Sequence, residues 1–167
     1  MSVAMQTPSD FNAFPWMQTA FEELGVREIP GKAHNRRIIE YHSAAGGAKD
    51  EEVAWCSSFV NWVMQQNGVK GTGRANARSW TSWGTTLSTP VFGCIAVLTR
   101  PPKPYHGHVA FYTGETSGKL VLLGGNQDNA VCLKDYARNR LITYRWPPGA
   151  PVPNSASTPA PYLVSGP

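Results

Sequence analysis

The sequence predicts an α+β domain in which helices come first and an antiparallel sheet follows. Apolar residues recur at helical spacing in the first half of the chain, and the second half holds short runs rich in β-forming residues. Gly, Pro, Asn and Asp separate these runs, as they do in sheets built from hairpins and turns. With 167 residues the chain is long enough for one domain with a single substantial core.

Three helices are predicted, each with its own start or stop signal. The first follows Pro15, a residue suited to the first helical turn, and stops at Gly25. The second takes Asn35 as its N-cap and ends at the Gly46–Gly47 pair. The third spans residues 56–67 and is closed by an Asn-Gly pair, with three acidic residues just before it.

Five strands are predicted in the second half, at residues 94–99, 108–113, 119–124, 130–133 and 141–146. We expect residues 1–147 to form the domain. Residues 148–167 are dominated by proline, serine and alanine, which predicts an extended, disordered tail.

Charge and cysteine content exclude several classes of protein. The formal net charge is +4, but the cations are scattered rather than gathered as in nucleic-acid binders. A mildly basic surface also suits an anionic polymer such as a bacterial cell wall. Three cysteines without a C-x-x-C pair predict neither a disulfide framework nor a zinc site. We expect no metal and no cofactor.

The N-terminus lacks the basic segment and unbroken apolar run of a secretory signal, and no run of about 20 apolar residues could cross a bilayer. We therefore expect a protein made in the cytoplasm without a signal peptide, and no membrane insertion.

Cys56 is the residue whose chemistry matters most, and it allows three interpretations. It can be a small buried hydrophobe, a metal ligand or a nucleophile. Its place at the start of a helix favours a thiolate, because unpaired backbone N–H groups and the helix dipole stabilise negative charge there. A metal site built from Cys94, His106 and His108 is the weaker alternative, because that spacing matches no common structural zinc site.

A partner base and a third polar residue follow Cys56 in chain order. Among the four histidines, His34 and His42 are interpreted as surface or capping residues and His106 as a loop residue, whereas His108 begins a strand. Asn126 ends the next strand and could fix the orientation of an imidazole; a simple turn is the alternative for its segment. The combination indicates a papain-like thiol hydrolase that performs acyl transfer.

The sequence also resembles the cysteine peptidase and amidase domains of the NlpC-like and CHAP superfamily, in particular phage-associated and toxin-associated members. The resemblance covers about residues 14–147. It rests on the segments "PWMQTAFEELGVREIPG", "AWCSSFVNWVMQQNGVKGTGRANARSWTSWG", "GHVAFYTGE", "LLGGNQDNAV" and "YRWP".

This resemblance implies a papain-like fold that cleaves amide bonds of bacterial peptidoglycan. Cys56 matches the nucleophile, His108 the general base and Asn126 the third residue, for which Gln127 or Asp128 are the alternatives. Many members have aspartate directly before the nucleophile, where this chain has tryptophan. Substrate contacts are predicted for a set of neighbouring residues, with packing in a small core as the alternative for the last two tryptophans: Gly107, Trp55, Ser57, Trp80 and Trp83.

The sequence thus predicts a monomeric peptidoglycan hydrolase, either an antibacterial effector or a phage lysin. Its expected partners are the peptide stems of the wall and, for a toxin, a cognate immunity protein. It would act in the periplasm or cell wall after delivery by a secretion system or by phage lysis. The alternative is a non-catalytic wall-binding or interaction module on the same fold.

Overall fold

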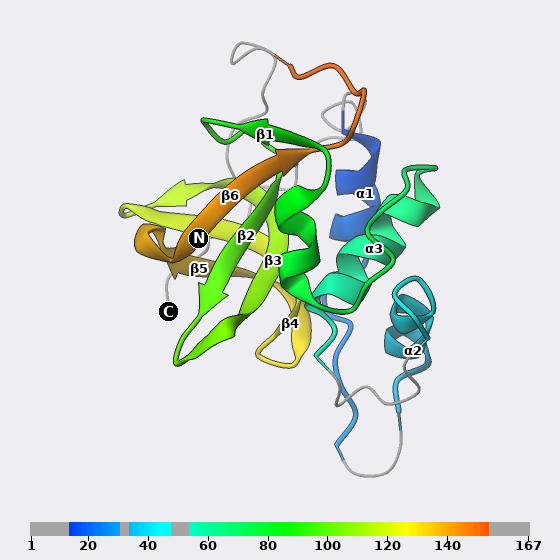
Figure 1. Ribbon diagram of the computed structural model, residues 1–167. Helices are drawn as coiled ribbons and strands as arrows, with labels where there is room; N and C mark the ends of the chain where they lie inside the picture. Colours follow the sequence, from blue (N-terminus) through cyan, green and yellow to red (C-terminus); the bar gives the residue numbers. More distant parts are fainter. Residues whose placement is uncertain (1–13, 31–33, 48–53, 154–167) are drawn as a thin grey trace.

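The protein is described from a computed structural model, which covers residues 14–30, 34–47 and 54–153. Figure 1 shows two regions, a curved antiparallel sheet and a group of helices that packs against one side of it. The predicted α+β arrangement is confirmed.

The helices are α1 (Pro15–Glu22), α2 (Arg36–Ser43) and α3 (Cys56–Gln66). Pro15 occupies the first turn of α1, and the Asn35 side chain accepts a hydrogen bond from the Arg37 backbone N–H, as an N-cap does. The acidic residues predicted to precede α3 lie outside the described residues. No helix in the described ranges is both long and apolar enough to span a bilayer.

The strands are β1 (Thr85–Leu87), β2 (Ile95–Arg100), β3 (Lys103–Thr116), β4 (Lys119–Gln127), β5 (Ala130–Ala137) and β6 (Leu141–Trp146). They form one sheet in the order β1-β6-β2-β3-β4-β5, and each strand pairs antiparallel with its neighbours. Within the described ranges, two short 3-10 helices, η2 (Ala77–Ser82) and η3 (Arg138–Arg140), connect elements. All five predicted strands are present; β1, only three residues long, was not predicted.

Helix α3 is the central helix of the fold. Every residue from Cys56 to Met64 is buried, because α3 is enclosed by α1, α2 and the sheet. The Phe59 ring packs against Tyr41 of α2 at 5.2 Å and against Phe111 of β3 at 6.2 Å, both edge to face. These contacts hold the N-terminal end of α3, and therefore Cys56, in a fixed position against the sheet.

A β-bulge interrupts the pairing of β4 with β5. Gly124 pairs with Cys132 and Gln127 pairs with Ala130, so β4 has one more residue than β5 between these two pairs. Asn126, inside the bulge, has a φ of 54°. The extra residue reverses the alternation of side chains between the two faces of the sheet. As a result Gln127, rather than Asn126, faces the candidate site.

The predicted tail begins at residue 148, and its first part is included in the described residues. Ala150 packs against the core, so packing continues slightly beyond the predicted domain end. Residues 154–167 lie outside the described residues.

Candidate active site

Cys56 is the first residue of α3 and lines a pocket of about 310 Å³. Its side chain is almost fully buried, at 2% exposure. The backbone N–H groups of Ser57 and Val109 hydrogen-bond to the sulfur, and Val109 follows His108 directly. The nucleophile candidate therefore lies where α3 meets the segment of β3 that carries the base candidate.

The electrostatics of Cys56 differ from the expectation. Burial raises the pKa of its thiol, and this effect outweighs the hydrogen bonds from backbone N–H groups and the nearby charge of Arg100, which lower it. The predicted stabilisation by the helix start is real but smaller than the desolvation of the charged form. In the free protein Cys56 is a neutral thiol at pH 7 rather than a thiolate.

His108 is held by an amide. Its Nε2 atom lies 2.9 Å from Oε1 of Gln127, and both side chains are buried. The Gln127 amide group donates through its own nitrogen to the carbonyls of Cys132, at 2.6 Å, and Leu122, at 3.3 Å. A flipped amide would place its oxygen against two carbonyl oxygens, so Oε1 must face the imidazole.

This network fixes the tautomer of His108. Because Oε1 of Gln127 can only accept, the imidazole carries its proton on Nε2 and donates it. Nδ1 is then the basic nitrogen. A neutral imidazole whose other nitrogen is locked by an acceptor has the arrangement that a general base needs.

Tyr136 of β5 completes the environment of the imidazole. Its ring stacks on His108 with 5.3 Å between centroids, and its hydroxyl oxygen lies 3.2 Å from Nε2. Burial lowers the pKa of His108 to about 4, against the hydrogen bond to Gln127, which raises it. Sequence reasoning missed Tyr136, because no local pattern indicates which residue of β5 packs on His108.

The prediction that Asn126 orients His108 is wrong, and the bulge gives the reason. In regular alternation Asn126 would lie on the same face of the sheet as Leu122 and Gly124. This is the face on which Gly124 lies next to Ala110 of β3. The bulge places Gln127 on that face instead, next to Gly124, whose missing side chain leaves room for the amide. Gln127 was one of the alternatives for the third residue. Asp128 faces Lys134, with a 2.8 Å ion pair.

Two of the predicted substrate contacts are internal. The Trp55 ring is fully buried, stacks on Tyr41 and donates its N–H to Glu28 at 2.7 Å. Ser57 is fully buried and donates to the carbonyl of Arg74 at 2.6 Å. Neither side chain can reach a ligand, and the prediction is corrected: both are structural residues.

The same correction applies to Trp80 and Trp83, for which packing was the stated alternative. Their rings meet edge to face at 4.8 Å, and exposure is 0% and 9%. Trp80 donates its N–H to Ser57, and Trp83 donates to the carbonyl of Lys70. Both N–H groups are occupied inside the fold, so these rings form part of the core.

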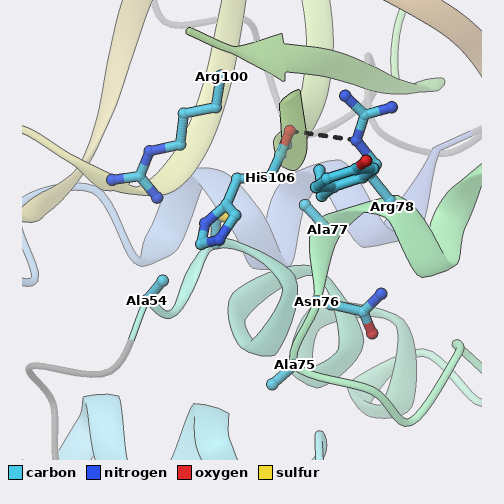
Figure 2. Close-up of a pocket in the computed structure, with 10 residues that line it drawn as sticks. Ala54, Ala75, Asn76, Ala77, Arg78, Arg100 and His106 are labelled. Carbon is cyan, nitrogen blue, oxygen red and sulfur yellow. Dashed lines mark hydrogen bonds between the residues drawn. The ribbon is translucent and has the colours of Figure 1, made fainter. Parts of the chain in front are cut away.

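Gly107 does lie in the pocket that contains Cys56. A Cβ atom there would lie 2.9 Å from the carbonyl oxygen of Leu98 and 3.1 Å from Cγ of Arg78. The glycine therefore permits the close approach of η2 to β3. Arg78 holds this approach, because its guanidinium donates to the carbonyls of Pro104 and His106, at 2.8 and 3.1 Å (Figure 2).

The remaining histidines divide by exposure. His106 is exposed, and its imidazole lies at the pocket between Ala54 and Arg100 in Figure 2. His42 was interpreted as a surface or capping residue, and this is wrong. It is fully buried in α2, where its Nδ1 atom lies 2.8 Å from the Ser58 hydroxyl.

A second pocket, of about 390 Å³, contains the base candidate. It is lined by His108, Gln127 and Tyr136 together with several charged or amide side chains of β4, β5 and their turns. Arg100 lines both pockets. His108 thus lines one pocket and Cys56 the other, and Arg100 is shared by the two.

Part of the chain matches a known protein family. Residues 48–126 match the CHAP domain, a range that includes Cys56 and His108 and ends one residue before Gln127. The structure is similar to that of NlpC1 from Trichomonas vaginalis, with 16% identity and a TM-score of 0.50 over 86% of this chain. It is also similar to an NLP/P60 family protein from Staphylococcus aureus subsp. aureus Mu50, described as similar to lipoprotein, with 17% identity and a TM-score of 0.46 over 87% of this chain.

The chain covers 46% and 44% of the lengths of these two proteins, less than half of each. No curated protein matches the sequence. The predicted resemblance to the NlpC-like and CHAP superfamily is confirmed, and with it the papain-like α+β fold. Proteins of the CHAP and NlpC/P60 families are generally peptidoglycan hydrolases, typically cysteine peptidases or amidases.

Proposed function

We propose that the protein hydrolyses amide bonds of cell-wall peptides by a thiol mechanism in which Cys56 is the nucleophile, His108 the general base and Gln127 the residue that orients the base. One observation carries the proposal. The imidazole of His108 is fixed by an acceptor at Nε2, and the residue after it contacts the sulfur of Cys56.

In the first half of the reaction, Nδ1 of His108 takes the thiol proton as the sulfur attacks the carbonyl carbon of the scissile amide. The amide oxygen becomes an oxyanion, which backbone N–H groups of the first turn of α3 would stabilise. The imidazolium then gives its proton to the leaving amine. An S-acyl intermediate remains on Cys56.

In the second half, water loses a proton to Nδ1 of His108 and attacks the acyl carbon. The carboxylic acid product leaves, and the thiol recovers its proton from the imidazolium. The lowered pKa of His108 keeps the imidazole neutral at pH 7 and also weakens it as a base, so proton transfer depends on stabilisation of the imidazolium in the complex. Gln127 stabilises the imidazolium by accepting from Nε2 throughout.

Biological context adds a second part to the proposal. The substrate is the peptide part of peptidoglycan, and the protein acts as an antibacterial effector or as a lysin in the periplasm or cell wall. A cognate immunity protein would accompany the effector role. These statements rest on the resemblance to phage-associated and toxin-associated members of the superfamily.

The delivery part has its own experiment. The protein is produced in a bacterium with and without an added export signal, and cell lysis is followed by optical density. Lysis only of the cells that export it would support a wall substrate. Equal lysis in both cases would oppose it, and a Cys56→Ala version controls for damage caused by export itself.

The catalytic part is tested with insoluble dye-labelled peptidoglycan. The wild type should release soluble dye, whereas Cys56→Ala and His108→Ala should release almost none while keeping a native circular dichroism spectrum. Full release by both variants would remove the enzyme proposal. The alternative, a wall-binding module, would then predict that wild type and Cys56→Ala both sediment with peptidoglycan.

A further inference from the structure

The pocket beside His108 carries an excess of positive charge that the proposed chemistry does not use. Arg100, Lys134 and Arg140 line it, and Asp128 is the one carboxylate among the described residues that line it. Arg100 ends β2, Lys134 lies in β5 and Arg140 ends η3, and the fold brings all three to one pocket of about 390 Å³. Pockets of this size hold small polar ligands or parts of larger ones.

Two of the three cations are already engaged. Lys134 pairs with Asp128 at 2.8 Å. Arg140 donates from Nε and Nη2 to the carbonyl of Thr99, at 3.2 and 2.9 Å, and its guanidinium lies over the Tyr136 ring. These contacts hold the Lys134 ammonium and the Arg140 guanidinium at the pocket wall. Of the two, only Lys134 has a carboxylate partner within the described part of the chain.

Arg100 differs from both. It is exposed, ends β2, and has neither a hydrogen bond nor an ion pair with any residue in the described ranges. It lines the pocket of Cys56 and the pocket of His108 alike, and Figure 2 shows its long side chain across His106 from Arg78. The Arg100 guanidinium, unpaired among the described residues and lining both pockets, is placed to meet a ligand in either of them.

We propose that Arg100, supported by Lys134 and Arg140, binds a carboxylate of the substrate, so that the enzyme prefers peptides with a free carboxylate close to the scissile amide. This inference rests on the proposed function, since it specifies the substrate of that site. A guanidinium forms paired, charge-assisted hydrogen bonds with a carboxylate, and a carboxamide offers no such charge.

The positive field also acts on the base. Burial is the main cause of the lowered pKa of His108, and the charges of Arg100, Arg140 and Lys134 lower it further. A bound carboxylate would offset these charges and stabilise the imidazolium that forms in the reaction. A negatively charged ligand would therefore favour both substrate binding and proton transfer to His108.

The test measures binding without turnover. Cys56→Ala protein is titrated calorimetrically with two forms of one synthetic wall stem peptide, one with free carboxylates and one with all of them converted to carboxamides. We expect the free acid to bind about tenfold more tightly. In Cys56→Ala/Arg100→Gln this preference should disappear, whereas Cys56→Ala/Arg138→Gln should retain it.

Arg138 is the matched control, because it loses the same charge but lies away from both pockets, paired with Glu115. Arg100→Lys keeps the positive charge but loses the paired N–H donors of the guanidinium. It should retain part of the preference for the free acid. Inorganic phosphate serves as a third probe. Displacement of the peptide by phosphate at equal concentration would indicate a general anion site and would overturn the proposal.

Equal binding of acid and carboxamide, or binding of neither, would also overturn it. The two proposals fail separately. If the wild type cleaves both peptide forms equally well, the hydrolase stands and the carboxylate site falls. If the acid binds through Arg100 but is never cleaved, the binding site stands and the hydrolase falls.

Discussion

Nε2 of His108 and Oε1 of Gln127 lie 2.9 Å apart, and the other end of the same amide is tied to the backbone carbonyls of Leu122 and Cys132. The amide cannot rotate without losing these bonds. The imidazole orientation is therefore determined by the backbone of β4 and β5 rather than by another mobile side chain. A neutral orienting residue also leaves the positive pocket beside it without an extra carboxylate.

Gln127→Ala should lower kcat roughly tenfold to a hundredfold and change KM little, because it frees the imidazole without touching substrate. The loss should be smaller than that of His108→Ala, since a positioned base typically contributes about 10²–10⁴-fold. Steady-state kinetics on a soluble wall peptide measures both constants.

Asn126→Ala is the control for that experiment. The imidazole hydrogen-bonds to Gln127 rather than to this residue, so we expect near wild-type kcat. A crippled Asn126→Ala together with a fully active Gln127→Ala would show that the observed hydrogen bond has no part in catalysis.

Gly124→Ala should act through Gln127. A Cβ atom at Gly124 would lie 2.7 Å from Oε1 of Gln127 and 2.7 Å from Cβ of Ala110, so the amide must shift. Overpacking of this kind typically costs about 1–3 kcal/mol of stability. We expect kcat to fall about as much as in Gln127→Ala, with chemical denaturation reporting the stability loss.

A double-mutant cycle decides the route of the Gly124 effect. In a Gln127→Ala background, Gly124→Ala should change kcat little, because its target is already absent. Additive losses would mean that the alanine disturbs the site by another path.

The stability of the protein should fall between pH 6.5 and about 4 because of His108. Its ordinary pKa is 6.5 and burial lowers it to about 4 in the folded protein, so the unfolded chain binds the proton first as the pH drops. The contribution is about 3 kcal/mol when the pH has passed through both values.

Urea unfolding of wild type and His108→Gln at a series of pH values measures this effect. The free energy of unfolding of the variant should depend less on pH across that window. Parallel curves for the two proteins would contradict a His108 that is neutral and buried.

Alkylation should distinguish Cys56 from Cys94. Burial raises the pKa of both thiols, that of Cys94 to about 12, but Cys56 lines a pocket whereas Cys94 is fully buried. We therefore expect labelling by iodoacetamide to speed up with rising pH and to reach Cys56 before Cys94. Peptide mapping by mass spectrometry gives the order, and earlier modification of Cys94 would exclude an accessible Cys56.

Much of the fold could be predicted because its signals are local. Pro15 and Asn35 mark helix starts, and turn residues bound each of the five predicted strands. Cys56 and His108 could be predicted for the same reason, since a helix start and a strand start are visible in the sequence. Strand β1 could not be predicted, because its three residues are too few to show a periodic pattern.

The errors in the site come from tertiary structure. Because β4 contains one extra residue, Gln127 rather than Asn126 faces His108. A bulge of this kind is defined by pairing with β5 rather than by the sequence of β4 alone. The burial of Trp55 and Ser57 likewise depends on partners in other segments, Glu28 and the backbone at Arg74. Arg100 gave no sequence signal, because its position is meaningful only between two assembled pockets.

The central claim is that the Cys56 thiol cleaves an amide bond of peptidoglycan, and mass spectrometry of digested wall tests it most directly. Purified peptidoglycan is incubated with wild type or with folded Cys56→Ala, and the soluble fragments are identified. The wild type should release fragments with new carboxyl and amino ends at one amide bond, and Cys56→Ala should release none. Identical fragments from both proteins, or fragments cut only between sugars, would contradict the account.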